Sequence, residues 1–101
     1  MTEGSATSGE VTLRLPAVLA DLVGGRRSLV VAPAPRTVGD LLDRVEVDEP
    51  LVVRRIRDET GTLRRFVNVY VDGDDIRHLD GLATPLRGGA TVHVLPSVAG
   101  G

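Results

Sequence analysis

One amphipathic helix, with short alternating segments on both sides of it, is the feature that most constrains the fold of this chain. The helix is predicted to begin at Thr37, because Thr37 and Asp40 have the spacing of a capping box, and to end at residues 48–50. Four apolar side chains within it share one helix face: Val38, Leu41, Leu42 and Val45. A helix with a single apolar stripe needs a sheet to cover that stripe.

Segments in which apolar and polar residues alternate predict that sheet. The first two are joined through Gly24-Gly25 and form an antiparallel hairpin with a long connection, in which residues 17–23 are expected to be a short turn or loop. Asp72-Gly73 is a turn signal between two later segments. The predicted strands are residues 11–15, 28–31, 66–71, 75–77 and 90–95.

The order of these elements predicts an α+β protein with the β-grasp (ubiquitin-like) fold. An early hairpin is followed by one main helix, and the last strand can return beside the first, which gives a mixed sheet of four to five strands. Leu82 and Leu86 are expected to plug the core. We expect residues 1–9 to be a disordered tail, residues 10–95 to be the domain, and residues 96–101 to be a flexible arm.

The segment from Leu51 to Arg65 carries five arginines around a turn-like Asp-Glu-Thr-Gly centre. Mixed charge runs are usually solvated, so we interpret this segment as a solvated connection between the helix and the next strand. The alternative is a docking surface for an acidic or phosphate-bearing partner.

Composition excludes several function classes. The 101 residues contain no cysteine, so neither a disulfide nor a thiol site is available. A net charge of −2 and 2% aromatic residues argue against nucleic acid as a partner. No apolar run is long enough to span a membrane, and residues 1–10 lack the pattern of a secretory signal, so the cytoplasm is the expected location.

Independent catalytic chemistry is not indicated. His78 and His93 have no companions at metal-ligand spacing, and Ile76 interrupts the acidic run after residue 71 where a calcium loop needs an oxygen ligand. No metal site is therefore predicted, and no catalytic constellation can be argued. All 12 basic residues are arginine, so the chain has no lysine side chain to accept an isopeptide bond.

Three stretches of the sequence together resemble the ubiquitin-like sulfur carriers of the MoaD/ThiS type. They are residues 64–77, residues 81–86, and residues 92–101, which end in Pro-Ser-Val-Ala-Gly-Gly. Within that family they are most similar to the actinobacterial carriers of thiocarboxylate-dependent cysteine biosynthesis. The resemblance is dense from Arg64 onward and weaker from Val11 to Val45. Gly89 departs from it, since relatives often have Asp after the turn glycine.

The resemblance implies a carrier that acts as co-substrate of partner enzymes and has no bound cofactor. A ubiquitin-activating-type enzyme would spend ATP to adenylate the Gly101 carboxylate, and a sulfur donor would convert it to a thiocarboxylate. A pyridoxal-phosphate synthase of cysteine, or of another sulfur-containing metabolite, would accept the sulfur, and a metalloprotease would regenerate the Gly-Gly end. The alternatives are the small subunit of molybdopterin synthase and a ubiquitin-like protein modifier.

The site residues follow from this resemblance and from the strand pattern. Gly101 carries the reactive carboxyl, and the six residues after Leu95 would reach roughly 20 Å if extended, with Gly100 narrow enough for a partner's channel. Arm recognition would use Pro96, Ser97, Val98, Ala99 and Gly100. Strand parity places a candidate docking surface on the face away from the core: Phe66, Tyr70, His93 and Leu95. Phe66 and Tyr70 could instead merely cover the sheet edge.

Overall fold

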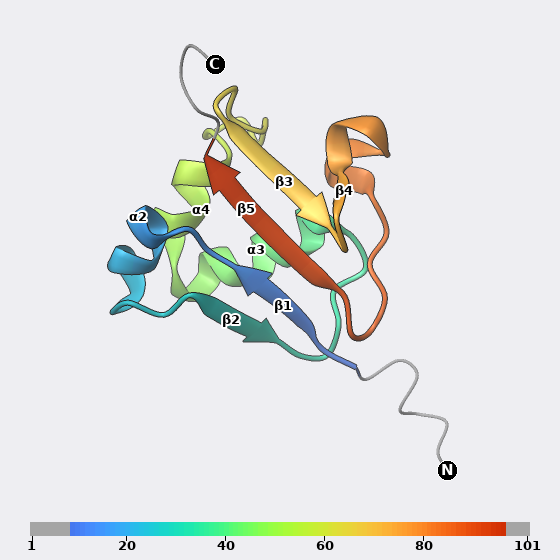
Figure 1. Cartoon of the computed structure of the whole chain (residues 1–101), viewed down its shortest axis with the longest axis horizontal. Helices are drawn as coiled ribbons and strands as arrows, with labels where there is room; N and C mark the ends of the chain where they lie inside the picture. Colours follow the sequence, from blue (N-terminus) through green and yellow to red (C-terminus); the bar gives the residue numbers. More distant parts are fainter. Residues whose placement is uncertain (1–8, 97–101) are drawn as a thin grey trace.

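Five strands form one mixed sheet in the order β2-β1-β5-β3-β4 in the computed structural model, which describes residues 9–96 (Figure 1). Helices α3 and α4 cover one face of this sheet. The strands are β1 (Val11–Arg14), β2 (Ser28–Val31), β3 (Val67–Val71), β4 (Asp74–Asp75) and β5 (Thr91–Pro96). The helices are α2 (Ala17–Ala20), α3 (Val38–Asp48) and α4 (Pro50–Ile56), with 3₁₀ turns at Asp21–Val23, Ile76–His78 and Gly81–Ala83.

The last strand lies at the centre of the sheet. β5 runs parallel to β1, with Leu13 opposite Val92, and antiparallel to β3, with Val69 opposite Val94. The early hairpin is also present, since β1 and β2 pair antiparallel. This is the predicted β-grasp fold, in which the last strand returns beside the first.

The main helix begins as the capping pattern predicts. The backbone N–H of Asp40 donates to the Thr37 hydroxyl at 3.0 Å. The Asp40 carboxylate accepts from the backbone N–H of Arg36 at 3.1 Å, one residue before the cap position, where a capping box would return the bond to Thr37 itself. The start of α3 at Val38 is therefore confirmed, although the Asp40 carboxylate bonds the N–H of Arg36 and not that of Thr37.

The core lies between the inner face of the sheet and the two helices. All four apolar residues of the predicted stripe on α3 are buried. Each fully buried Val, Leu or Ile side chain contributes roughly 1.5–3 kcal/mol through removal of apolar surface from water. The sheet contributes Val11, Leu13, Leu29, Val69, Val71, Val92 and Val94.

The interpretation of residues 51–65 as a solvated connection is wrong for its first part. Pro50 occupies the first turn of α4, where a missing N–H costs nothing, and Val52, Val53 and Ile56 are buried against the core. Their spacing of i, i+1 and i+4 is that of one helix face. This apolar face is short and is interrupted by arginines, so its pattern in the sequence is weak. Pro50, which was expected to end the main helix, begins α4 instead.

Residues 17–23 were expected to be a turn or loop, and this prediction is also wrong. They form α2 and a 3₁₀ turn, which bury Leu19, Ala20 and Val23 at the same i, i+1, i+4 spacing. The turn prediction at Asp72-Gly73 is confirmed: Asp72 has φ 49° and Gly73 has φ 95°, the positive values that a two-residue turn between β3 and β4 requires. The strand predicted at residues 75–77 is wrong for its last two residues, because β4 ends at Asp75, whose carboxylate accepts from the Arg77 N–H at 2.8 Å and begins the 3₁₀ turn Ile76–His78.

Leu82 and Leu86 pack against the core as expected, although both are only partly buried. Gly39 permits this packing, because a Cβ at that position would lie 3.3 Å from the Leu82 carbonyl oxygen. Within residues 9–96, no helix has the length and apolar character needed to cross a membrane.

The role of α4 in the core can be tested by replacing Ile56 with Ala. Ile56 has no exposed surface, so the cavity should lower the free energy of unfolding by roughly 2–5 kcal/mol. Leu51→Ala on the same helix is the matched control, because Leu51 is 66% exposed and should change stability by about 0.5 kcal/mol or less. Urea denaturation measures both, and equal effects would contradict this account of α4.

Candidate functional site

The carboxyl end of β5 is the point from which the expected arm continues. Pro96 is the last residue of β5 and lies opposite Val67, the first residue of β3, so the strand extends one residue beyond the predicted end at Leu95. Pro96 is exposed. The other predicted arm residues lie outside the described residues: Ser97, Val98, Ala99, Gly100 and Gly101.

The open face of the sheet carries most of the predicted docking residues. Tyr70 lies opposite His93 across β3 and β5, and both alternate with buried valines, so their side chains lie on the face away from the helices. Leu95 is on the same face and is 37% exposed. The structure therefore places these three residues together beside the end of β5.

Strand pairing adds two residues to this face that the sequence pattern alone did not select. Arg14 of β1 lies opposite His93, and Asn68 of β3 lies opposite Leu95. Strand parity could have included Asn68, but only the parallel pairing of β1 with β5 brings Arg14 to the surface beside His93. The open face thus combines apolar, aromatic and basic groups.

Phe66 differs from the other predicted docking residues because it lies just before β3. Its side chain is 62% exposed, which leaves it accessible to a partner. Phe66 lines a surface hollow together with Arg55, Arg64 and Arg65. Since Val67 lies opposite Pro96, this hollow is next to the end of β5.

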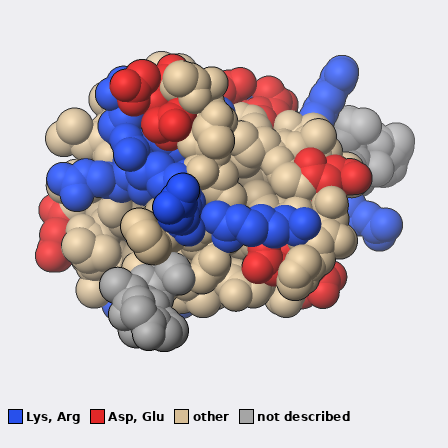
Figure 2. Space-filling model, turned by 90° about the horizontal axis from the view of Figure 1, so that it is seen from above, with Lys and Arg blue, Asp and Glu red and all other residues tan. Residues whose placement is uncertain are grey.

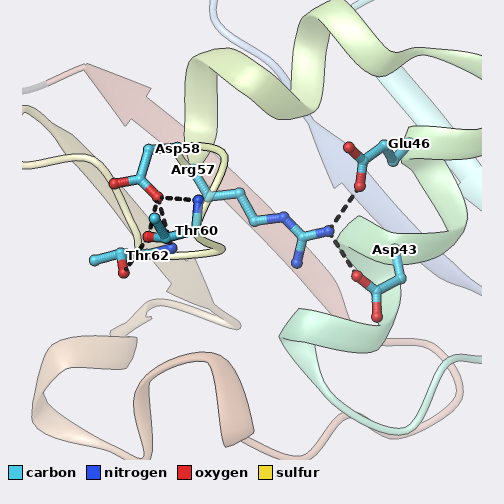
Figure 3. Close-up of polar contacts among 6 residues, drawn as sticks. All are labelled: Asp43, Glu46, Arg57, Asp58, Thr60 and Thr62. Atoms are coloured by element: carbon cyan, nitrogen blue, oxygen red, sulfur yellow. Dashed lines mark hydrogen bonds and ion pairs between the residues drawn. The ribbon is translucent and has the colours of Figure 1, made fainter.

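Arg57 fixes the loop that leads to this hollow (Figure 3). Its guanidinium lies 2.6 Å from Asp43 and 3.0 Å from Glu46, both on α3, and its side chain is only 12% exposed. Burial by itself would lower the pKa of Arg57, but hydrogen bonds and charge from the two carboxylates outweigh burial and hold the pKa above its usual value. The end of α4 is therefore tied to α3.

Asp58 closes the turn that follows. One carboxylate oxygen accepts from the Thr60 hydroxyl at 2.6 Å and from the backbone N–H groups of Thr60 and Thr62 at 2.9 and 3.1 Å (Figure 3). These bonds, with the Thr60 hydroxyl first and the charge of Arg64 a lesser cause, hold the pKa of Asp58 below its ordinary value. The turn returns the chain to α4, where the Arg64 N–H bonds the Ile56 carbonyl.

Two further arginines hold the end of this loop in place. The Arg64 Nε donates to the Arg54 carbonyl oxygen at 2.6 Å, near the end of α4. Arg77 donates to the Val67 carbonyl at 2.8 Å and to the Asn68 side chain at 2.9 Å, and more weakly to the Arg64 carbonyl at 3.3 Å. These bonds hold the loop against the first residues of β3.

Metal ligation is not indicated in the described part of the chain. Among residues 9–96, no group of three or more His, Cys, Asp or Glu side chains is arranged to hold a metal ion. His93 lies within β5, whereas His78 lies in the 3₁₀ turn after β4.

Comparisons with known proteins agree on one family. The sequence model of the ThiS family matches residues 13–101. The sulfur carrier protein CysO of Mycobacterium tuberculosis is 38% identical over 93 residues, which cover 90% of this chain and 98% of that protein. The small archaeal modifier protein 3 of Haloferax volcanii is 39% identical over 93 residues, covering 91% and 99% of the two chains.

A solved structure shares the fold. The crystal structure of the Amycolatopsis orientalis BexX/CysO complex contains a chain that superimposes with a TM-score of 0.74 at 37% identity. The superposition covers 90% of this chain and 99% of that chain.

The Asp58 turn yields a prediction about pH. Thr60→Val removes the hydroxyl donor, so the pKa of Asp58 should rise toward its ordinary value of 3.8. Because the folded-state pKa lies below the unfolded one, this turn stabilises the fold above the unfolded pKa, and the contribution is lost as the pH falls through the folded pKa. Thr60→Val should therefore reduce the stabilisation that the ionised Asp58 carboxylate gives to the folded state.

Titration of the Asp58 carboxyl carbon by NMR measures the change. Thr62→Val is the control, because the Thr62 hydroxyl contacts Thr60 and only its backbone N–H contacts Asp58. If the pKa of Asp58 is unchanged in Thr60→Val, the Thr60 hydroxyl is not the main cause of the lowered pKa.

Proposed function

The chain belongs to the ThiS family and is a sulfur carrier protein of that type, and from this premise we propose that the Gly101 carboxyl group carries the sulfur as a thiocarboxylate. The observation that carries the proposal is the match of the family model through Gly101, combined with an exposed end of β5. Because Pro96 is still part of β5, residues 97–101 follow the strand, and they would span roughly 17 Å if extended, enough to enter a partner's buried site.

The proposed chemistry has two steps, both on a partner enzyme. A carboxylate is a poor electrophile, so one oxygen of Gly101 first attacks the α-phosphorus of ATP and releases pyrophosphate, which gives an acyl-adenylate. A sulfur nucleophile then attacks the acyl carbon, and AMP leaves with the original carboxyl oxygen. The product sulfur is ionised at neutral pH and is a stronger nucleophile than a carboxylate, for the same reason that a thiolate is the reactive form of a thiol.

The carrier supplies the sulfur and the surface by which it is recognised, and the partners supply the catalytic groups. Pro96 would direct the arm away from β5, and Ser97, Val98, Ala99 and Gly100 would line the partner's channel. Gly100 has no Cβ, so the channel can enclose the backbone closely beside the acyl carbon.

The open face of the sheet supports a docking role. Tyr70, His93 and Leu95 lie together beside the end of β5, and exposed Phe66 lies at the start of β3. Aromatic and apolar groups are enriched at the centres of protein interfaces. A partner that admits the arm would contact this face as well.

The sulfur acceptor is proposed from the relatives. The relative CysO is named a sulfur carrier protein, which supports sulfur delivery. On the resemblance to the actinobacterial carriers, we propose cysteine biosynthesis as the pathway, with a pyridoxal-phosphate synthase as acceptor and a metalloprotease that regenerates the arm. The complex of a similar CysO with BexX supports a protein partner that accepts the sulfur, and a synthase of another sulfur-containing metabolite is the second acceptor class that we propose.

Protein modification is the second candidate function, because one relative is named a small archaeal modifier protein. Conjugation would join the Gly101 carboxyl to lysines of other proteins. This chain has no lysine, so it cannot form chains through its own side chains. Covalent adducts on cellular proteins would favour this function over sulfur delivery alone.

Intact-mass spectrometry tests the carrier function. Incubation with ATP, a sulfide source and the cognate activating enzyme should add the mass difference of one oxygen replaced by one sulfur. Deletion of Gly101 should abolish the change, since the remaining end is displaced from the reacting position. If the wild-type chain gains no mass while the enzyme is active on ATP, the proposal fails.

Leu95→Asp tests the open face. A charge placed among Tyr70, His93 and Leu95 should weaken docking and raise KM for the carrier about tenfold, equivalent to roughly 1.4 kcal/mol of binding, with kcat nearly unchanged. Val47→Asp is the matched control, because Val47 is 81% exposed on α3, on the other side of the sheet. Equal KM values for Leu95→Asp and Val47→Asp would show that the open face of the sheet is not part of the interface.

A further inference from the structure

Four exposed arginines gather at the end of the molecule from which β5 leaves. Arg55, Arg64 and Arg65 line one hollow with Phe66, and Arg77 is bonded to the Arg64 and Val67 carbonyls beside it. We call this set the arginine rim. Figure 2 views this end of the molecule: basic side chains run across it in a band, while acidic ones lie mostly toward the edges.

The rim carries an excess of positive charge, because three of its arginines line the hollow and, in the described part of the chain, Asp58 is the one carboxylate that lines it with them. Among residues 9–96, none of its four guanidinium groups forms an ion pair, whereas Arg26 pairs with Glu49 and Arg57 pairs with Asp43 and Glu46. Asp58 keeps its negative charge and lies close enough to Arg64 for the arginine's charge to lower the pKa of Asp58, so it offsets part of the rim's positive charge but not all of it. The chain as a whole has a net charge of −2, so the rim reverses the overall sign locally.

The rim is held in position by the backbone beneath it. Arg64 and Arg77 donate to carbonyl oxygens of α4 and of the chain leading into β3, which fixes two of the guanidinium groups. Within the described residues, the side chains of Arg55 and Arg65 make no hydrogen bond or ion pair, so their donors are open to a partner. The rim therefore combines two guanidinium groups held in place, those of Arg64 and Arg77, with two whose donors are available to a partner, those of Arg55 and Arg65.

The location of the rim links it to the arm. Val67 follows Arg65 and Phe66 in the chain and lies opposite Pro96, the last residue of β5. A protein that takes the arm into a channel as far as Pro96 therefore brings the mouth of that channel against the rim. Four arginines covered by an apolar or basic surface would lose their hydration without compensation, which is costly. Carboxylates at the channel mouth provide bidentate partners for guanidinium groups.

We propose that the arginine rim is a docking surface for an acidic collar around the channel of the adenylating enzyme that receives the arm. This inference rests on the proposed function, because it assumes that a partner takes up the arm. Charged groups at the edge of an interface act mainly on the rate of association and on its salt dependence. The rim therefore steers the arm toward the channel, and the open face and the arm supply the close contacts.

The test compares two doubly charge-reversed variants. Arg55→Glu with Arg65→Glu reverses the two open members of the rim. Arg36→Glu with Arg87→Glu reverses two exposed arginines near the start of β5, at the opposite end of that strand, and changes the net charge by the same amount. Pyrophosphate release by the cognate activating enzyme is measured against carrier concentration, and circular dichroism confirms that both variants are folded.

The rim variant should lower kcat/KM roughly 10-fold to 100-fold at low ionic strength, with kcat almost unchanged, because steering changes association rates over this range. The loss should nearly disappear at about 1 M salt, where the Debye length is only roughly 3 Å. The control variant should stay within about threefold of wild type. Equal loss in the two variants, or a loss that salt does not relieve, would overturn the proposal.

The same assay separates this inference from the proposed function. If the wild-type chain supports pyrophosphate release and gains sulfur, but the rim variant is indistinguishable from it, the docking surface is wrong and the carrier function stands. If the wild-type chain supports neither, the proposed function fails, and the rim proposal fails with it. Binding of a transfer-RNA mixture that the rim variant alone loses, without an effect on pyrophosphate release, would assign the rim to nucleic acid and overturn the acidic collar.

Discussion

β5 is inserted between β1 and β3, and this pairing closes the sheet over the core and sets where the described chain ends at Pro96. Without it, the early hairpin and the β3–β4 hairpin would be two separate ribbons, each too small to cover the apolar stripe of α3. The pairing also has a direction: because β5 is parallel to β1, its carboxyl end and Arg14 reach the same end of the sheet. One set of backbone hydrogen bonds therefore closes the core and positions the arm.

A second set of contacts shapes the surface around that end. Buried Val52, Val53 and Ile56 attach α4 to the core, and the paired Arg57 links the end of α4 to α3. From this fixed point the Asp58 turn brings the chain back to β3 and leaves Arg64, Arg65 and Phe66 beside Pro96. The chain thus uses some of its arginines as structural ties and leaves others open, and only their neighbours distinguish the two uses.

Much of the fold could be predicted because the signals were local. The Thr37 cap, the stripe on α3, the Asp72-Gly73 turn and the alternation in β3 and β5 depend on residues within a few positions of one another. Two of the errors, at residues 17–23 and 50–56, have one cause. Each helix is so short that its apolar face consists of three residues at i, i+1 and i+4, and such a pattern becomes decisive only when a core exists to bury it.

Residue identity and spacing along the chain were enough to predict the β-grasp order, to exclude thiol chemistry and to show the family resemblance that singles out Gly101. Strand parity also grouped Tyr70, His93 and Leu95 on one face. The folded chain was needed to show that Arg14 joins this face and that four arginines lie beside the end of β5: Arg55, Arg64, Arg65 and Arg77. Those neighbours come from strand order and from a loop folded back by side-chain hydrogen bonds, and neither is a periodic property of the sequence.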